Sequence, residues 1–244
     1  MTSLFTIKKQ SQYQWFQPTL LLTTSQRLLF ALAFSTLFLI ISSLTLGFFF
    51  TQQDAQQGEH FKMIYLHVPF AWICMLSYLL LCISSFLYLI SKHPIFFQVS
   101  KSFSITGSLF TFSCLITGSL WGFPTWGTFW VWDARLTSVL LLFFIYSIHL
   151  LLCYSTKEST SCFFALVGMI NLPIIKYSVE WWSTLHQGAS ITQSTHSIHE
   201  SIFIPMFLFW IALLLYSSLV LLIHLRSYIL ISRIHSLKSQ RNLF

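Results

Sequence analysis

The chain has 244 residues, of which 55% are hydrophobic and only 8% are charged. Soluble domains carry about 25% charged residues, so this composition excludes a protein that lies mainly in water. The net charge of +7 does not indicate nucleic-acid binding, because the cations are scattered and lie mainly in loops beside apolar segments. We therefore expect an all-α, polytopic membrane helix bundle.

Residues 1–27 precede the first apolar segment and form a basic tail. The tail contains Lys8, Lys9 and Arg27 and no acidic residue. It lacks a short apolar stretch followed by a small-residue cleavage site, so we interpret it as an N-terminal tail on the inner side of the membrane rather than as a removed targeting segment.

Six segments are apolar over about 20 residues, the length that a helix needs to cross a membrane. Asn171, Pro173 and Lys176 interrupt the far end of the fifth segment, which predicts a span that is short or kinked there. The spans form one domain over 28–225, and 226–244 follow as a basic C-terminal tail. In chain order the segments are roughly 28–50, 67–90, 103–121, 136–155, 161–177 and 202–225.

Small residues follow one face of the third span at helical spacing: Gly107, Thr111, Cys114 and Gly118. In a membrane such a face lets a neighbouring helix approach closely, so it favours helix packing over a ligand site.

The positive charges predict how the spans are oriented. Of the 13 Lys and Arg residues, only Lys62, Arg135 and Lys176 belong to the side of the membrane opposite the N-terminus. Loops on the cytoplasmic side are rich in Lys and Arg, so we expect both termini in the cytoplasm or the mitochondrial matrix, with outer segments at roughly 51–66, 122–135 and 178–201.

The middle outer segment, about 121–135, is unusually rich in tryptophan. An aromatic belt at the membrane interface explains isolated tryptophans, but not this concentration beside Gly122, Pro124 and Gly127. Such turn residues predict a loop that folds back and presents a flat apolar platform, which suits a planar macrocycle. The four tryptophans, out of nine in the chain, are Trp121, Trp126, Trp130 and Trp132.

Histidine is the usual neutral nitrogen ligand for the iron of such a macrocycle. His67 lies at the outer end of the second span, two residues before Pro69, and His186 follows the aromatic pair Trp181 and Trp182. The residues alone favour these two histidines only slightly over three others on the outer side, which fit an interfacial or hydrogen-bonding role: His60, His196 and His199. We interpret His149, in the fourth span, as an interhelical hydrogen-bonding residue.

Four stretches resemble the cytochrome c maturation protein C family (CcmC, haem exporter protein C), whose members handle haem through a tryptophan-rich WWD loop. The most specific stretch reads WGTFWVWDARLTS over 126–138, and the chain departs there from the family by having Phe129 where Trp is frequent. The other three stretches are 57–69, 121–124 and 173–187.

The resemblance implies a six-span protein that binds haem on its outer face, with His67 and His186 as axial ligands. It further implies delivery of this haem to a membrane-anchored haem chaperone, in association with an ATP-binding-cassette complex. The expected location is the mitochondrial inner membrane or the bacterial plasma membrane. We expect an assembly factor rather than an enzyme; a haem-bearing electron carrier and a membrane transporter are the alternatives.

Within this hypothesis the expected cofactor is haem b, held non-covalently and transiently, since the cysteines form no CxxCH attachment signature. Arg135 is expected to meet a haem propionate, and Asp133 to orient Arg135 or to contact the chaperone. The tryptophans that are expected to stack on the porphyrin or wall it are Trp121, Trp126, Trp130 and Trp132.

Overall fold

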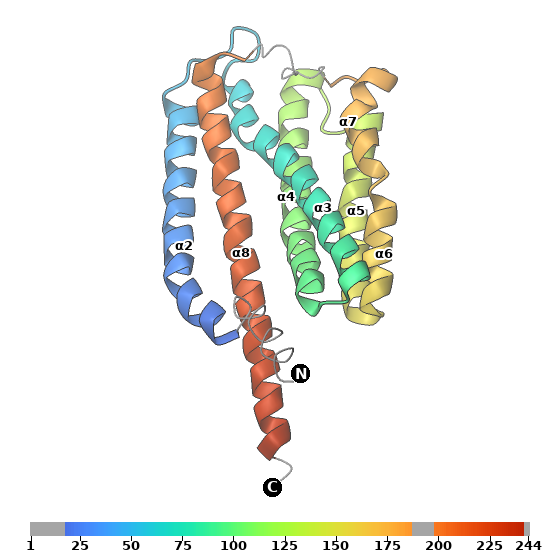
Figure 1. Ribbon diagram of the computed structural model, residues 1–244. Helices are drawn as coiled ribbons and strands as arrows, with labels where there is room; N and C mark the ends of the chain where they lie inside the picture. The colour runs from blue at the N-terminus through green and yellow to red at the C-terminus, as the bar shows by residue number, and fades with distance from the viewer. Residues whose placement is uncertain (1–17, 187–197, 242–244) are drawn as a thin grey trace, which may run out of the picture.

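The computed structural model describes residues 18–186 and 198–241, and these residues are almost entirely helical (Figure 1). No β-strand occurs within these two ranges. The helices are α2 (Pro18–Phe49), the 3-10 helix η2 (Glu59–Met63), α3 (Ile64–Ser91), α4 (Pro94–Trp126), α5 (Ala134–Ser155), α6 (Glu158–Gly168), α7 (Asn171–Trp181) and α8 (Glu200–Arg241).

Six helical stretches of the described chain are long and apolar enough to cross a membrane, which confirms the predicted all-α bundle of six spans. The fifth stretch consists of α6 and α7 together. The last helix is longer than predicted, because α8 continues to Arg241 through most of the segment that was expected to be a separate tail.

The bundle has two flanks joined by α3 (Figure 1). Helices α2 and α8 pack against each other on one flank, and α4 to α7 lie on the other, while α3 contacts both α4 and α8. The core between α3, α4 and α5 contains the fully buried Tyr78, Phe110 and Tyr146. Tyr146 Oη donates to the carbonyl of Cys74 at 2.7 Å, so its polar end is satisfied inside the bundle.

The small-residue face of α4 allows close packing, as the sequence predicted, but Cys114 and Gly118 on this face also line a cavity, which was not expected. A Cβ atom on Gly107 would lie 2.2 Å from the Tyr146 ring of α5, and one on Gly118 would lie 2.8 Å from the His67 ring of α3. Both rings therefore occupy space that a larger residue would fill.

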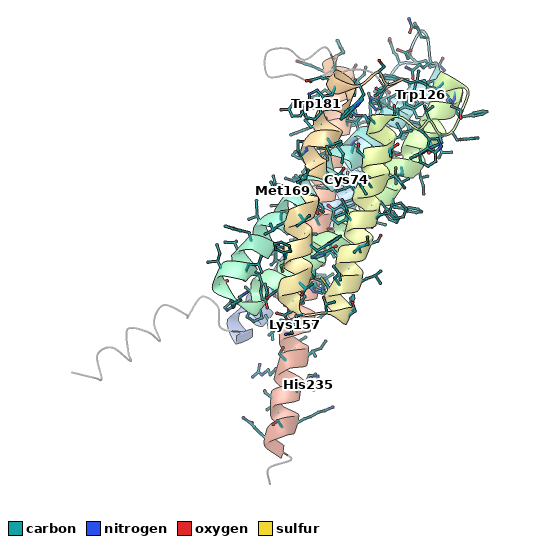
Figure 2. All side chains as sticks on the ribbon, turned by 90° about the vertical axis from the view of Figure 1, so that its right-hand side faces the viewer. Cys74, Trp126, Lys157, Met169, Trp181 and His235 are labelled. Carbon is teal, nitrogen blue, oxygen red and sulfur yellow. The ribbon has the colours of Figure 1, made fainter. Side chains whose placement is uncertain are left out.

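The predicted interruption of the fifth span is present, near the middle of that span. Helix α6 ends at Gly168 and α7 begins at Asn171, and Figure 2 shows Met169 between Lys157 and Trp181. The break precedes the residues that predicted it, because the ring of a proline obstructs the carbonyl four positions earlier, here that of Met169.

Hydrogen bonds between a side chain and a backbone carbonyl join each side of this break to a neighbouring helix. Tyr78 Oη donates to the Ala165 carbonyl at 2.8 Å, and Asn171 Nδ2 donates to the Ser138 carbonyl at 2.9 Å. Polar backbone groups cannot turn to water inside a bilayer, so these bonds hold the two half-helices in place.

The connections α2–α3 and α4–α5 and the outer end of α7 lie at the same end of the bundle, opposite the C-terminus (Figure 1). Trp126 and Trp181 both lie at this end (Figure 2). The segments that the sequence assigned to one membrane face are thus gathered together; which face this is stays a prediction.

Candidate functional site

The tryptophan-rich segment is half helix and half loop. Helix α4 continues to Trp126, so the connection to α5 is only 127–133, and not the whole of 121–135 as expected. Gly122 and Pro124 were expected to be turn residues, but glycine and proline are tolerated within membrane helices. Gly122 instead provides room, because a Cβ there would lie 3.0 Å from the Trp126 ring.

Two local signals fix this short connection. Gly127 ends α4 with a positive φ of 76°, and its N–H donates to the Phe123 carbonyl at 2.9 Å. Asp133 begins α5 as its N-cap, with Oδ1 accepting from Leu136 N at 2.7 Å. Asp133 therefore has a structural role at the helix start, and the described residues contain no ion pair between Asp133 and Arg135.

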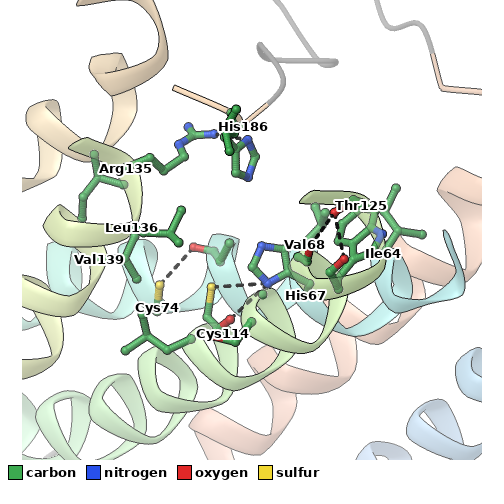
Figure 3. A pocket seen from close by; sticks show the side chains of 18 of the residues that line it. Ile64, His67, Val68, Cys74, Cys114, Thr125, Arg135, Leu136, Val139 and His186 are labelled. Carbon is green, nitrogen blue, oxygen red and sulfur yellow. Dashed lines mark hydrogen bonds between the residues drawn. The ribbon is translucent and has the colours of Figure 1, made fainter. Parts of the chain in front are cut away.

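A cavity of about 450 Å³ opens at this end of the bundle, a size typical of small-molecule and cofactor sites (Figure 3). Its deeper wall includes Cys74 of α3 and Cys114 of α4. The predicted site residues that line the cavity are His67, Trp121, Trp126, Trp130, Arg135 and His186.

His67 lies in the first turn of α3 and is held by α4. Its Nδ1 is 3.1 Å from the Cys114 carbonyl and 3.2 Å from Thr117 Oγ1. The Thr117 hydroxyl donates to the Ser113 carbonyl at 2.8 Å, so both neighbours of Nδ1 act as acceptors. The ring proton of a neutral His67 is therefore on Nδ1, which leaves the lone pair of Nε2 as a potential metal ligand.

Trp121 connects His67 to the first outer segment. Its ring meets the His67 ring edge-on, with centroids 5.9 Å apart, and its Nε1 donates to Gln57 Oε1 at 2.8 Å. The Asp54 carboxylate in turn accepts from the backbone N–H of Gln57 at 2.8 Å. Sequence reasoning missed Gln57 as a cavity residue; the resemblance over 57–69 was the only available signal.

His186 and Arg135 face the cavity from the other side (Figure 3). Arg135 lies in the first turn of α5, and its Nη1 is 3.2 Å from His186 Nδ1. The Trp126 ring lies beside His186, with centroids 6.3 Å apart. Lys176 of α7 also lines the cavity, as a second cation that was not predicted as a site residue.

Two predicted site residues lie outside the cavity lining. Trp132 is 77% exposed and packs edge-on against Trp130, and Asp133 caps α5. Phe129 is also outside the lining and stacks on Phe123, with centroids 4.4 Å apart. An apolar ring is sufficient for that contact, so it explains why Phe is compatible with the position.

Of the other histidines that the structure describes, none lines the cavity. His60 is exposed in η2, and His199 Nδ1 is 2.9 Å from Ser201 Oγ. His149 is fully buried in α5, where its Nδ1 is 3.7 Å from Cys153 Sγ one turn along the same helix. Within the part of the chain that the structure describes, it makes no interhelical hydrogen bond of the kind that was expected. His196 lies outside the described residues.

Fold and cavity together define the class of the molecule: a multi-pass α-helical membrane protein with an aromatic cavity at one end, faced by two histidines. The family model described as Heme exporter protein C matches residues 11–240. The chain therefore belongs to the Heme exporter protein C family, which confirms the resemblance found in the sequence.

Individual relatives agree with this assignment. A ccmC-like mitochondrial protein of cytochrome c biosynthesis from Marchantia polymorpha is 46% identical over 193 residues, which cover 79% of this chain and 84% of the relative. Heme exporter protein C of Bradyrhizobium diazoefficiens is 40% identical over 228 residues, 91% of this chain and 86% of the relative. The Escherichia coli K12 protein of the same name is 40% identical over 190 residues, 76% of this chain and 77% of the relative.

Proposed function

We propose that the chain binds haem b non-covalently and transiently in the end cavity and presents it to a membrane-anchored haem chaperone during cytochrome c maturation. The observation that carries this proposal is the convergence of His67 and His186, from separate parts of the chain, on one cavity walled by tryptophans. Family membership supports the haem-handling role and the link to cytochrome c assembly.

The cavity suits haem in three respects. Trp121, Trp126 and Trp130 provide large apolar surfaces for a flat macrocycle. His67 offers the Nε2 lone pair, and the His186 imidazole faces the same space. Trp130 Nε1 is buried and makes no hydrogen bond within the described residues, so a donor is available to a polar group of the ligand.

The two cations suit the carboxylate edge of haem. A guanidinium such as that of Arg135 binds carboxylate with two parallel hydrogen bonds, and Lys176 adds a second positive charge at the same cavity. We assign Arg135 to one propionate and Lys176 to the other. Trp132, which is exposed beside the cavity, is assigned to the rim that meets the chaperone.

The proposed location follows from the distribution of charge. The cavity end carries the few cations of the outer segments, so we place it in the intermembrane space or the periplasm, with the bilayer around the six spans. An ATP-binding-cassette complex is the second proposed partner, acting with the chaperone after haem has been presented.

Replacement of either cavity histidine tests the proposal. We expect His67→Ala and His186→Ala each to lower the haem content of the purified protein several-fold, measured as pyridine haemochrome, because each removes one iron ligand. His60→Ala is the matched control, since His60 is exposed outside the cavity lining, and it should retain haem. Full haem content in both cavity variants would refute the ligand assignment; rapid reversible electron exchange with a quinone would favour an electron carrier instead.

A further inference from the structure

The contact between Arg135 and His186 determines which nitrogen of that imidazole carries the proton. Arg135 Nη1 lies 3.2 Å from His186 Nδ1. A guanidinium is always protonated and has only donors, so Nδ1 must accept with its lone pair. The single proton of the neutral ring is then on Nε2. In this arrangement neither ring nitrogen of His186 offers a lone pair to iron.

His67, on the other side of the cavity, is in the opposite state. Its Nδ1 faces two acceptors, Cys114 O and Thr117 Oγ1, so its Nε2 has a lone pair before any ligand arrives. Of the two proposed axial ligands, His67 therefore has a lone pair available for iron. His186 does not, because Arg135 occupies the lone pair of its Nδ1.

We propose that Arg135 makes iron binding by His186 conditional on a carboxylate group of the porphyrin. This inference rests on the proposed haem-binding function. A carboxylate is a stronger partner for a guanidinium than a neutral imidazole is, because the bond joins two full charges and can be bidentate. A propionate that reaches Arg135 therefore draws the guanidinium away from His186.

The transfer of Arg135 from His186 to a propionate requires no further proton donor or acceptor. When Arg135 leaves, the Nδ1 lone pair of His186 is released, and the ring still carries one proton on Nε2. The ring then binds iron through Nδ1, or through Nε2 after its proton exchanges to Nδ1 by way of solvent. No proton is gained or lost, and Arg135 stays charged throughout.

The site would therefore select a porphyrin by its peripheral carboxylates as well as by its metal. A porphyrin iron with free carboxylates obtains both histidines, whereas one without them obtains His67 alone. Arg135 is thus a specificity-determining residue that acts through His186. Lys157, an exposed cation outside the cavity lining, serves as the matched control.

The test compares haem with haem dimethyl ester, in which both propionates are blocked, on the full-length protein in detergent. Spin state from optical and electron paramagnetic resonance spectra reports whether one or two imidazoles bind iron. We expect wild type to give a six-coordinate, low-spin spectrum with haem and a five-coordinate, high-spin spectrum with the ester. Arg135→Met should raise the low-spin fraction with the ester several-fold, while Lys157→Met should behave as wild type.

A wild-type spectrum that is equally low-spin with haem and with the ester, and that requires His186 in both cases, would overturn the inference. If haem itself gives no spectrum that depends on His67 and His186, the proposed function fails instead, which is a different result.

A second measurement needs neither haem nor a folded Arg135 variant. In haem-free protein labelled with ¹⁵N-histidine, with His186 assigned through His186→Gln, we expect the magnetic resonance signal of an unprotonated Nδ1 and a protonated Nε2. A protonated Nδ1 in the wild type would contradict the inference directly.

Discussion

At the scale of single residues, the candidate site depends on the fixed orientation of the His67 ring. Cys114 and Thr117 fix the His67 ring through Nδ1, and the absence of a side chain at Gly118 gives the ring its space. The sequence analysis selected His67 as a residue type at a helix start. It did not predict which ring nitrogen is free, because that depends on α4 carbonyls that only the packed bundle brings near.

Gly118→Ala tests this close contact. The added Cβ would lie 2.8 Å from His67 Cε1, so the ring must shift, at the cost of about 1–3 kcal/mol that is usual for overpacking. We expect haem affinity to fall by about tenfold, measured by optical titration. Leu120→Ala, on the exposed side of the same helix, is the control and should bind haem as wild type does. Unchanged affinity in Gly118→Ala would show that the imidazole is not confined as described.

At the scale of elements, the ends of the helices determine where the site residues lie. Sequence reasoning predicted six spans because each is a long apolar run. It placed the end of α4 five residues too early, since Gly122 and Pro124 indicate a turn in water and not in a membrane helix. The position of this helix end matters for the site. Trp121 and Trp126 project from a rigid helix, whereas Trp130 and Trp132 belong to the short connection that follows.

Asp133 is the N-cap of α5, and Arg135 lies in the first turn of that helix. Asp133→Ala should lower the stability of the protein by about 1 kcal/mol, seen as a lower midpoint of thermal unfolding, because the helix loses its N-cap. Asp133→Asn should preserve stability and haem binding, since asparagine caps equally well. If Asn were as harmful as Ala, the carboxylate charge, and not the cap, would be what the protein needs from this residue.

At the scale of the whole molecule, distant segments converge. His67 lies in the first turn of α3, Arg135 lies in the first turn of α5, and His186 follows α7, yet all three face one cavity. The charge pattern and the family resemblance predicted that they belong to one end of the bundle. The Arg135–His186 contact was beyond prediction, because it requires the relative placement of two segments whose sequences carry no sign of each other. The exposure of Trp132 could not be predicted either, because neighbouring residues in the sequence are of the same aromatic type.

We propose that His67 and His186 together bind one iron. The most direct measurement is electron paramagnetic resonance of the ferric haem complex in wild type, His67→Gly and His186→Gly, each with and without added imidazole. We predict a low-spin, two-imidazole signal in wild type, its loss in both variants, and its return when free imidazole fills the space left by the missing ring. A two-imidazole signal that persists in either variant without added imidazole would contradict the claim.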